Sequence, residues 1–179
     1  MAVNSLPIGT LGFELYDTNN DRLLGTASIE LPNLELQEVD VNGAGVLGLM
    51  SWPLFAQIQN MAATIHWRVL YDAAVSMMSN NAQFLTAYVA SEHYDSGEGQ
   101  RAIEGLKIVM RGLTQGLNLG NLEVGEQADT QTVLHLDYLK LSAMRGGNRE
   151  TLLEFSRFDY TYVVNGQDLM QDFKAALGL

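Results

Sequence analysis

Three glycines in the stretch VDVNGAGVLG, residues 39–48, have the spacing of a dinucleotide-binding turn. They are Gly43, Gly45 and Gly48, and they follow a strand-like run in the pattern G-x-G-x-x-G. In a nucleotide site such glycines let the backbone approach the pyrophosphate, and a helix that opens on them supplies amides and a positive dipole. The site also needs an acidic residue about 20 positions later, which binds the ribose hydroxyl.

The residues after the glycines do not meet these requirements. Pro53 stands within the second turn of the expected helix, where it would remove a backbone donor. No Asp or Glu occurs between Asp40 and Asp72. Asn42 and Gly43 are instead a favoured pair for the turn of a β-hairpin. We therefore expect a glycine-rich hairpin here and neither NAD nor FAD.

A second chemical pattern lies at the turn that contains TNNDR, where Asp17, Asn19 and Asp21 have the spacing that opens a calcium loop. An EF-hand then requires glycine at its sixth position and glutamate at its twelfth, and this chain has Arg22 and Ser28 there. Asx side chains also satisfy the amides of a turn by themselves. The sequence favours a polar turn and leaves open whether the three residues bind an ion.

Other residues that could do chemistry occur singly. His66, His93 and His135 each stand alone in a predicted strand, without the short spacing of a local metal site. The chain has no cysteine, which excludes disulfides, thiolate catalysis and cysteine-ligated zinc, and no serine lies in G-x-S-x-G. A catalytic pair distant in sequence stays open, but the expectation is no enzyme, no catalytic residue, no cofactor and no metal.

Composition points to a folded protein that does not hold nucleic acid. Of the 179 residues 47% are hydrophobic, and the formal net charge is −11, from 21 acids and 10 bases. An acidic surface repels phosphates rather than neutralising them. The first basic residue is Arg22, so we expect no secretory signal. The most apolar stretch, residues 46–56, is too short to span a bilayer, and no membrane anchoring is expected.

Period-two patterns predict most of the elements. Residues 11–17 and 23–31 read as a hairpin around the polar turn, and residues 28–42 read as a long acidic strand kinked at Pro32. Residues 61–69 alternate apolar and polar side chains and predict a half-buried strand. Further strands are expected at 83–94 and 103–113, and a final hairpin at 133–144 and 151–164, whose strands change apolar parity midway.

The acidic strand has an ambiguous register. Glu35 points away from Leu34 in an extended strand, whereas Glu38 and Asp40 share the parity of Leu34. A bulge near Gln37 would bring the three acids to one face.

Two helices and one long loop complete the prediction. A short helix is expected at 71–79, with Tyr71, Ala74, Val75 and Met78 on its apolar face. A C-terminal helix is expected within 165–179 (about 166–177), with an apolar stripe made by Leu169, Met170, Phe173, Ala176 and Leu177. Residues 114–132 contain Gly116, Gly120 and Gly125 and read as a long loop, which is usually functional or disordered.

The fold class is therefore mainly β: a single domain over residues 1–179, formed by an antiparallel β-sandwich or partly open barrel. It has about seven or eight strands, one short mid-chain helix and one C-terminal helix.

The order of motifs in the last two thirds resembles a known family. A strand ends in VMRG (109–112), a glycine- and acid-rich loop contains GEQADTQT (125–132), and a strand HLDYLKL follows. A terminal helix is opened by NG-x-D (165–168) and closed by LGL, and the earlier LPNLELQEVDVNGAG runs to a glycine-rich hairpin tip. This order resembles the major tail tube protein of contractile-tailed phages, over nearly the whole chain.

The resemblance implies a structural virion protein, assembled in the host cytoplasm into homohexameric rings that stack into a tube around a multi-chain β-barrel channel. DNA passes through without specific binding, and sheath, baseplate and tape-measure proteins are the other partners. It implies that the hairpin of 26–70 and the loop of 114–132 mediate assembly, with these candidate contact residues: Asn42, Gly43, Gly45, Gly48, Gly116, Gly120 and Gly125. It also makes Glu35, Glu38 and Asp40 candidates for lining the channel.

Two alternatives stay open at this stage. The tube of a phage-derived contractile bacteriocin or injection machine would use the same protomer. A monomeric small-ligand β-barrel would need an apolar cavity of its own.

Overall fold

The computed structural model describes residues 5–17, 19, 21–23, 25–145 and 148–179. Within them the chain forms eleven strands and two short helices. The strands are β1 (Ser5–Tyr16), β2 (Thr26–Glu30), β3 (Leu36–Val41), β4 (Met50–Ile58), β5 (Met61–Trp67), β6 (Gln83–Asp95), β7 (Gln100–Asn118), β8 (Thr130–Arg145), β9 (Asn148–Ser156), β10 (Thr161–Val164) and β11 (Gln167–Asp168). The helices are α1 (Asp72–Ser76) and α2 (Gln171–Leu177). The predicted class, mainly β and antiparallel with two helices, is confirmed.

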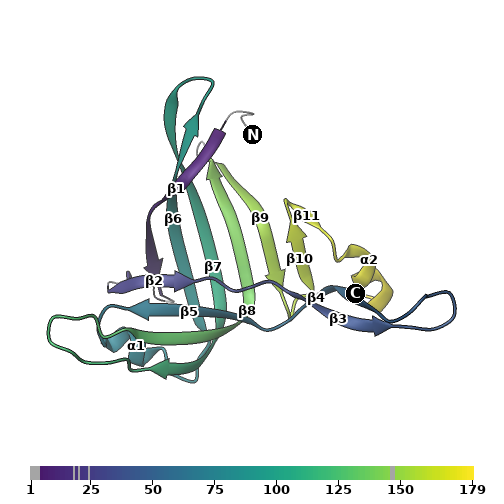
Figure 1. Cartoon of the computed structure of the whole chain (residues 1–179), viewed down its shortest axis with the longest axis horizontal. Helices are drawn as coiled ribbons and strands as arrows, with labels where there is room; N and C mark the ends of the chain where they lie inside the picture. The colour runs from purple at the N-terminus through teal and green to yellow at the C-terminus, as the bar shows by residue number, and fades with distance from the viewer. Residues whose placement is uncertain (1–4, 18, 20, 24, 146–147) are drawn as a thin grey trace.

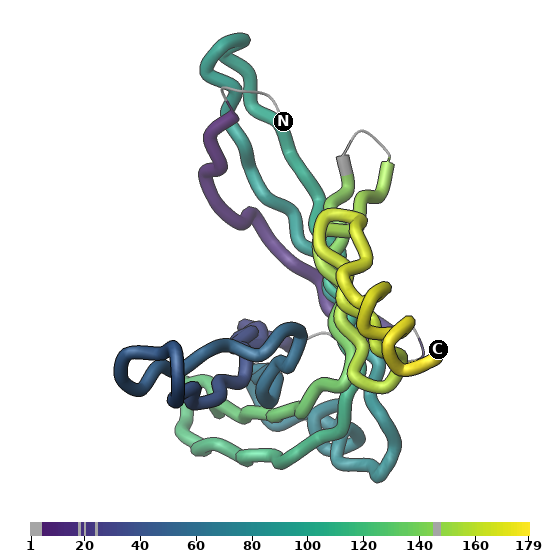
Figure 2. Tube along the Cα trace, turned by 90° about the vertical axis from the view of Figure 1, so that its right-hand side faces the viewer, coloured from purple at the N-terminus to yellow at the C-terminus, as the bar shows by residue number. Residues whose placement is uncertain are grey.

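Nine strands form one branched sheet, and the other two form a separate ribbon. The main path runs β1-β6-β7-β8-β9-β10-β11, while β5 pairs with β8 and β2 pairs with β5. Strands β3 and β4 make the two-stranded ribbon, which projects at one end of the molecule (Figure 1). From the side the molecule has the outline of a letter L, because an upper sheet stands on a lower layer (Figure 2). The sheet does not close into a barrel within one chain.

The corner of the L lies where β8 exchanges one neighbour for another. Residues 130–136 of β8 pair with β5, whereas residues 138–145 pair with β9. The register between β7 and β8 shifts at the same place: Arg111 is opposite Tyr138 and Gly112 is opposite Leu136, which leaves Asp137 as the extra residue. A strand that switches between two layers through a bulge is a common way to turn a sheet through a corner.

Gly112 is required at this corner by close packing. A Cβ built on Gly112 would lie 2.1 Å from the carbonyl oxygen of His135. No side chain fits there without moving the backbone of β8.

The core fills the angle between the upper sheet and the lower layer. The strand predicted at 61–69 is confirmed as β5, whose Met61, Ala63, Ile65 and Trp67 are buried. These side chains join one cluster with residues of the upper sheet such as Leu85 and Ile108. The indole Nε1 of Trp67 donates to Oγ1 of Thr132 at 3.0 Å, which pairs these two buried polar atoms.

The predicted N-terminal hairpin is wrong. Strand β1 pairs along its length with β6, and β2 pairs with β5. Among the described residues, the two segments are joined by a single isolated bridge between Tyr16 and Arg22. Residues 18, 20 and 24 of the intervening turn lie outside the described residues. The long-range partners pack only the end of β1 against the core, where Leu15 is buried, and they leave the first part of β1 exposed.

The acidic strand predicted at 28–42 is two strands. Residues 31–35 around Pro32 form no ladder, and pairing resumes only in β3. The partner of β3 is β4, which the sequence analysis did not predict as a strand. Pro53 is accepted because the ribbon has only two strands, so each strand has one unpaired edge.

The predicted loop at 114–132 is shorter in the structure. Strand β7 continues to Asn118 and β8 begins at Thr130, so the loop spans 119–129 and Gly116 belongs to β7.

The C-terminal region also differs from its prediction. The segment 151–164 divides into β9 and β10, which pair with each other around residues 157–160. Residues 165–168 make a turn and β11, and α2 begins only at Gln171.

Both helices turn some predicted apolar residues outward. In α1, Ala74 is buried together with Met77 just beyond the helix, while Tyr71, Val75 and Met78 are exposed. At α2, Met170 is buried but Leu177 is exposed. A periodic stripe on so short a helix indicates a face but not which neighbour covers it.

Candidate functional site

The register of the β3–β4 ribbon separates acidic and apolar side chains. Glu38 is opposite Pro53 and Asp40 is opposite Ser51, so these four share one face. Val39 is opposite Trp52 and Val41 is opposite Met50, on the other face. Val39, Met50 and Trp52 are exposed, and the exposed fraction of Trp52 is 56%. The ribbon therefore presents an uncovered apolar face and an acidic face.

The register of the ribbon shifts near Gln37, but the extra residues lie on β4 and not on the acidic strand. Leu36 is opposite Ile58 and Glu38 is opposite Pro53, so Gln37 alone faces residues 54–57. Beyond this shift, Asp40 accepts a hydrogen bond from Ser51 Oγ at 2.7 Å. Glu35 lies before the shift, outside β3, where its carboxylate accepts from Asn33 Nδ2 at 2.6 Å. All three candidate channel acids are exposed.

The glycine pattern forms the tip of the ribbon. Gly43, Gly45 and Gly48 all have positive φ, a conformation that favours glycine, and Asn42 is exposed beside them. The chain after Gly48 enters strand β4 instead of a helix. A helix N-terminus that would supply amides and a dipole to a pyrophosphate therefore does not follow these glycines.

The loop at 119–129 is held to the lower layer by its backbone. Asn121 N donates to Ala128 O, and Ala128 N donates to Arg68 O, each at 2.8 Å. A Cβ on Gly120 would lie 1.8 Å from Ala128 O, so this glycine allows the two arms of the loop to meet. Gly125 has positive φ in the outer part of the loop. Two of the three candidate loop glycines, Gly120 and Gly125, therefore lie in the loop itself, and Gly116 lies in β7.

An apolar cleft lies between this loop and the end of β5. It is lined mainly by Val69, Leu70, Leu122, Val124 and Ala128, with polar side chains at its edge. Leu122 and Val124 are strongly exposed. Sequence reasoning missed this cleft, although the apolar residues in an otherwise polar loop were a visible signal.

A polar network covers the outer side of the corner. Arg111 forms an ion pair with Asp137 at 2.9 Å, and Lys140 pairs with Glu154 at 2.8 Å. The Tyr138 hydroxyl donates to Glu154 at 2.8 Å. Burial, and then this hydrogen bond, raise the pKa of Tyr138 to about 12. The hydrogen bond with Asp137 raises the pKa of Arg111 above its ordinary value.

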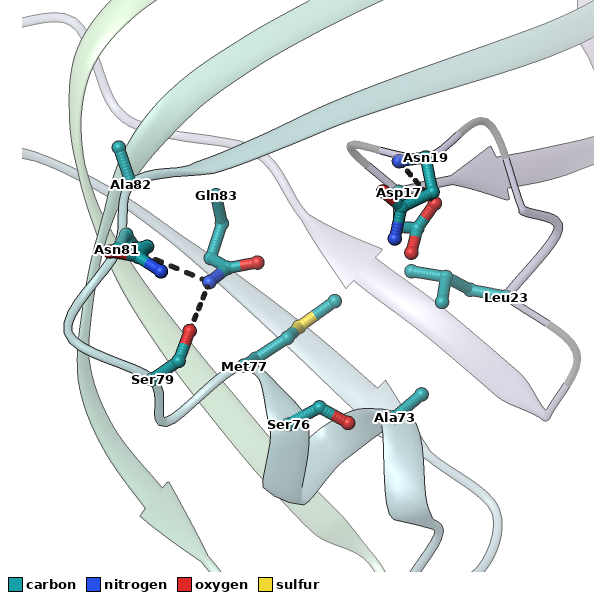
Figure 3. A pocket seen from close by; sticks show the side chains of 10 residues that line it. All are labelled: Asp17, Asn19, Leu23, Ala73, Ser76, Met77, Ser79, Asn81, Ala82 and Gln83. Carbon is teal, nitrogen blue, oxygen red and sulfur yellow. Dashed lines mark hydrogen bonds between the residues drawn. The ribbon is translucent and has the colours of Figure 1, made fainter.

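Of the three residues considered for ion binding, Asp17 uses its carboxylate within the turn. Asp17 Oδ1 accepts from the backbone N–H of Asn19 at 2.9 Å and of Asp21 at 2.8 Å, which is an Asx turn. Asp17 and Asn19 also line a pocket beside α1, whose other walls include Met77 and Gln83 (Figure 3). No cluster of three His, Cys, Asp or Glu side chains suited to a metal occurs in the part of the chain that the structure describes.

The three histidines lie on separate strands of the fold. His66 on β5 is near Glu30 and Asp129, and His93 on β6 is near Glu104. His135 is on β8 at the corner. Among the described residues, no helix is long and apolar enough to cross a membrane.

Comparison with known proteins adds one finding. A family model described as phage tail tube protein FII matches residues 11–178. No curated protein matches the chain.

Proposed function

The chain belongs to the phage tail tube protein FII family, and we propose that its copies form hexameric rings that stack into the inner tube of a contractile tail. A tail tube protein is a structural component of the virion. In the proposed tube the rings enclose a channel through which DNA is ejected, and assembly needs neither a cofactor nor a metal. The match across residues 11–178 is the observation that carries this proposal.

The surface of the single chain supports self-association. The apolar face of the β3–β4 ribbon has no cover, and β1 is an edge strand with Leu6, Ile8 and Leu11 exposed. A long apolar edge strand in a soluble protein invites pairing with another chain. Copies arranged in a ring would cover these surfaces, whereas a monomeric ligand-binding barrel would need a sheet closed within one chain.

We further propose that the acidic face of the ribbon lines the channel, with Glu38 and Asp40 on it and Glu35 beside it. Glu38 and Asp40 share a face by register, and all three acids are exposed. Six copies of a chain with net charge −11 carry a formal charge of −66. DNA binds to a protein when lysine and arginine side chains neutralise its phosphates and release the condensed counterions. A negatively charged channel offers few such side chains, so it does not retain the DNA.

The proposal includes partners and a place of assembly. Sheath protein would surround the tube, a baseplate would nucleate it, and a tape-measure protein would set its length, in the host cytoplasm before the tail joins the virion. The same protomer would serve the tube of a contractile bacteriocin, which differs in having no capsid. Mass spectrometry of purified particles from the producing cell would distinguish the two.

Electron microscopy of the purified protein tests the tube directly. Concentrated protein, alone and with added baseplates as seeds, should form rings or tubes with six-fold symmetry. Protein that stays monomeric by light scattering, even with seeds, would contradict the proposal.

The channel face is tested by charge reversal. In Glu35→Lys/Asp40→Lys tubes, duplex DNA should bind with strong salt dependence and ejection should slow most at low salt. Tubes that assemble and deliver DNA at the unmodified rate at every ionic strength would show that these acids lie elsewhere.

A further inference from the structure

The tripeptide Val-Asn-Gly occurs twice in the chain, at residues 41–43 and at residues 164–166. An asparagine followed by glycine is open to attack by the next backbone nitrogen on its own side chain, because glycine has no Cβ that hinders the approach. No other asparagine of the sequence precedes a glycine. Since the residue before each asparagine is also the same, a difference in reactivity between the two sites must come from the fold.

Asn42 stands at the start of the ribbon tip, which projects away from the two layers (Figure 1). Both Asn42 and Gly43 are exposed, and the carboxamide of Asn42 has no hydrogen-bond partner among the described residues. The backbone hydrogen bond within the tip runs from Val46 N to Gly43 O at 3.1 Å. It uses neither Asn42 nor the amide nitrogen of Gly43, so the peptide bond between these two residues is not held in place.

Asn165 lies in a much tighter turn. Val164 is opposite Gln167 in the β10–β11 ladder, so Asn165 and Gly166 are the two central residues of a hairpin. Their φ angles are +50° and +80°, as a type I′ turn requires. The backbone N–H of Asn165 also donates to Leu152 O on β9 at 2.8 Å. Asn165 is exposed as well, so the two sites differ in backbone restraint and not in access to water.

We propose that Asn42 is a site of spontaneous deamidation, and that the turn around Asn165 protects the identical tripeptide there. Hydroxide removes the proton from the amide nitrogen of Gly43, and this nitrogen attacks Cγ of Asn42. The bond from Cγ to the side-chain nitrogen breaks, and that nitrogen takes up a proton from water and leaves as ammonia. A second water then opens the succinimide ring at either carbonyl, which gives an aspartyl or an isoaspartyl residue. The reaction needs no oxidant, reductant or cofactor.

The backbone decides the rate because the attack requires rotation about the bond between Cα and the carbonyl carbon of the asparagine. This rotation brings the next amide nitrogen within reach of Cγ. At Asn165 it would break the turn and its pairing, so the reaction waits for local opening of the hairpin. At Asn42 no backbone hydrogen bond of that residue within the described chain opposes it.

Deamidation changes the ribbon tip in two ways. It adds a carboxylate two positions from Asp40, and the isoaspartyl product carries one extra carbon in its backbone. The tip therefore becomes more acidic and changes shape as the protein ages. This inference goes beyond the proposed tube, since it concerns the free chain and is tested whether or not rings form.

Peptide mapping of the aged protein by mass spectrometry tests the proposal. Unassembled protein is incubated at mildly alkaline pH, and the conversion of each asparagine is followed with time. Because a hairpin that is open about a tenth of the time reacts about tenfold more slowly, Asn42 should convert on the order of tenfold faster than Asn165. In urea, where the turn is lost, the two identical tripeptides should convert at the same rate.

Labelling by an isoaspartate-specific methyltransferase provides a second readout. The labelling should disappear in aged Asn42→Gln protein and persist in the matched control Asn165→Gln, because a longer side chain closes the ring much more slowly. Equal conversion of both sites in the folded protein, or faster conversion of Asn165, would overturn the proposal. So would an Asn42 that stays intact while the urea-unfolded chain reacts, or a difference between the sites that persists in urea. Peptide mapping of the unsubstituted protein decides among these outcomes even if a variant folds poorly.

Discussion

Arg111 on β7 clamps Asp137, the one residue of β8 at the corner that has no partner on β7. Arg111 Nε donates to both carboxylate oxygens of Asp137, at 3.2 and 3.0 Å, and Nη2 lies 2.9 Å from Oδ2. The backbone carbonyl of Asp137 accepts from Arg157 N at 3.1 Å. The bulge that turns β8 from the upper sheet into the lower layer is therefore held from both sides, by its side chain and by its backbone.

Removal of the Asp137 carboxylate should destabilise the corner. We expect Asp137→Ala to lower the free energy of unfolding by about 1–3 kcal/mol, because it deprives a half-buried guanidinium of charge-assisted hydrogen bonds. Urea denaturation followed by tryptophan fluorescence measures the change. Glu92→Ala is the control, since it removes a pair with Arg101, whose side chain is 81% exposed. An equal effect in both variants would show that the bulge does not depend on the clamp.

A methyl group at Gly112 should be among the least tolerated changes in β7. Its Cβ would meet the His135 carbonyl at 2.1 Å, whereas a Cβ at Gly116 would have nothing within 4 Å. We expect Gly112→Ala to cost about 1–3 kcal/mol or more through forced backbone movement. Gly116→Ala, in the same strand, should be close to neutral in thermal unfolding. Similar melting temperatures for the two variants would contradict the close packing at the corner.

Tyr138 should ionise later than an ordinary tyrosine. Because its folded pKa is raised from 10.0 to about 12, its contribution to stability is complete below pH 10 and is lost as the pH rises from there through 12. The ultraviolet titration of Tyr138→Phe should lack the most alkaline tyrosinate step of the folded protein. If the difference between the two titrations is centred near pH 10, burial and the Glu154 hydrogen bond do not control this hydroxyl.

Hydrogen exchange should distinguish the ribbon tip and the loop from the core. We expect residues 42–49 and 119–129 to exchange fast in the free protein and to become protected in the tube, because ordering glycine-rich segments must be offset by new contacts. Residues 131–136, which pair with β5 on one side and β7 on the other, should be slow in both states. Equal protection of the tip and the loop before and after assembly would show that neither joins an interface.

Local sequence patterns were sufficient to predict the elements whose conformation does not depend on the strands they pair with. The alternation in residues 61–69 identified β5 and its buried side, because a strand has one period whatever its partner. The glycines at 43, 45 and 48 identified a hairpin tip, since their positive φ is a property of the turn itself. The parity change near Gln37 predicted an extra residue in the acidic strand, but the structure has the extra residues in the partner strand β4.

Local sequence patterns did not predict which strands pair with each other. Residues 11–17 and 23–31 suggested a hairpin because they are near in sequence, yet β1 found β6 and β2 found β5. The backbone hydrogen bonds between two strands are chemically the same whichever strands pair. The choice of partner therefore depends on how the side chains pack. Strand β4 was not predicted either. A strand accepts a proline such as Pro53 only at an edge of a sheet, and the sequence does not show which strands lie at an edge.

By itself, the sequence determined a mainly β antiparallel chain, its acidic charge, its glycine-rich tip and its family resemblance, because composition, period and turn chemistry are local properties. Only the tertiary structure decided that β8 turns a corner at Asp137, that Glu38 and Asp40 lie opposite the apolar face of Val39 and Trp52, and that the cleft at Val69 and Val124 exists at all. Each of these depends on how separate segments pair and pack, and a shift of one residue in a register would reverse the faces of a strand.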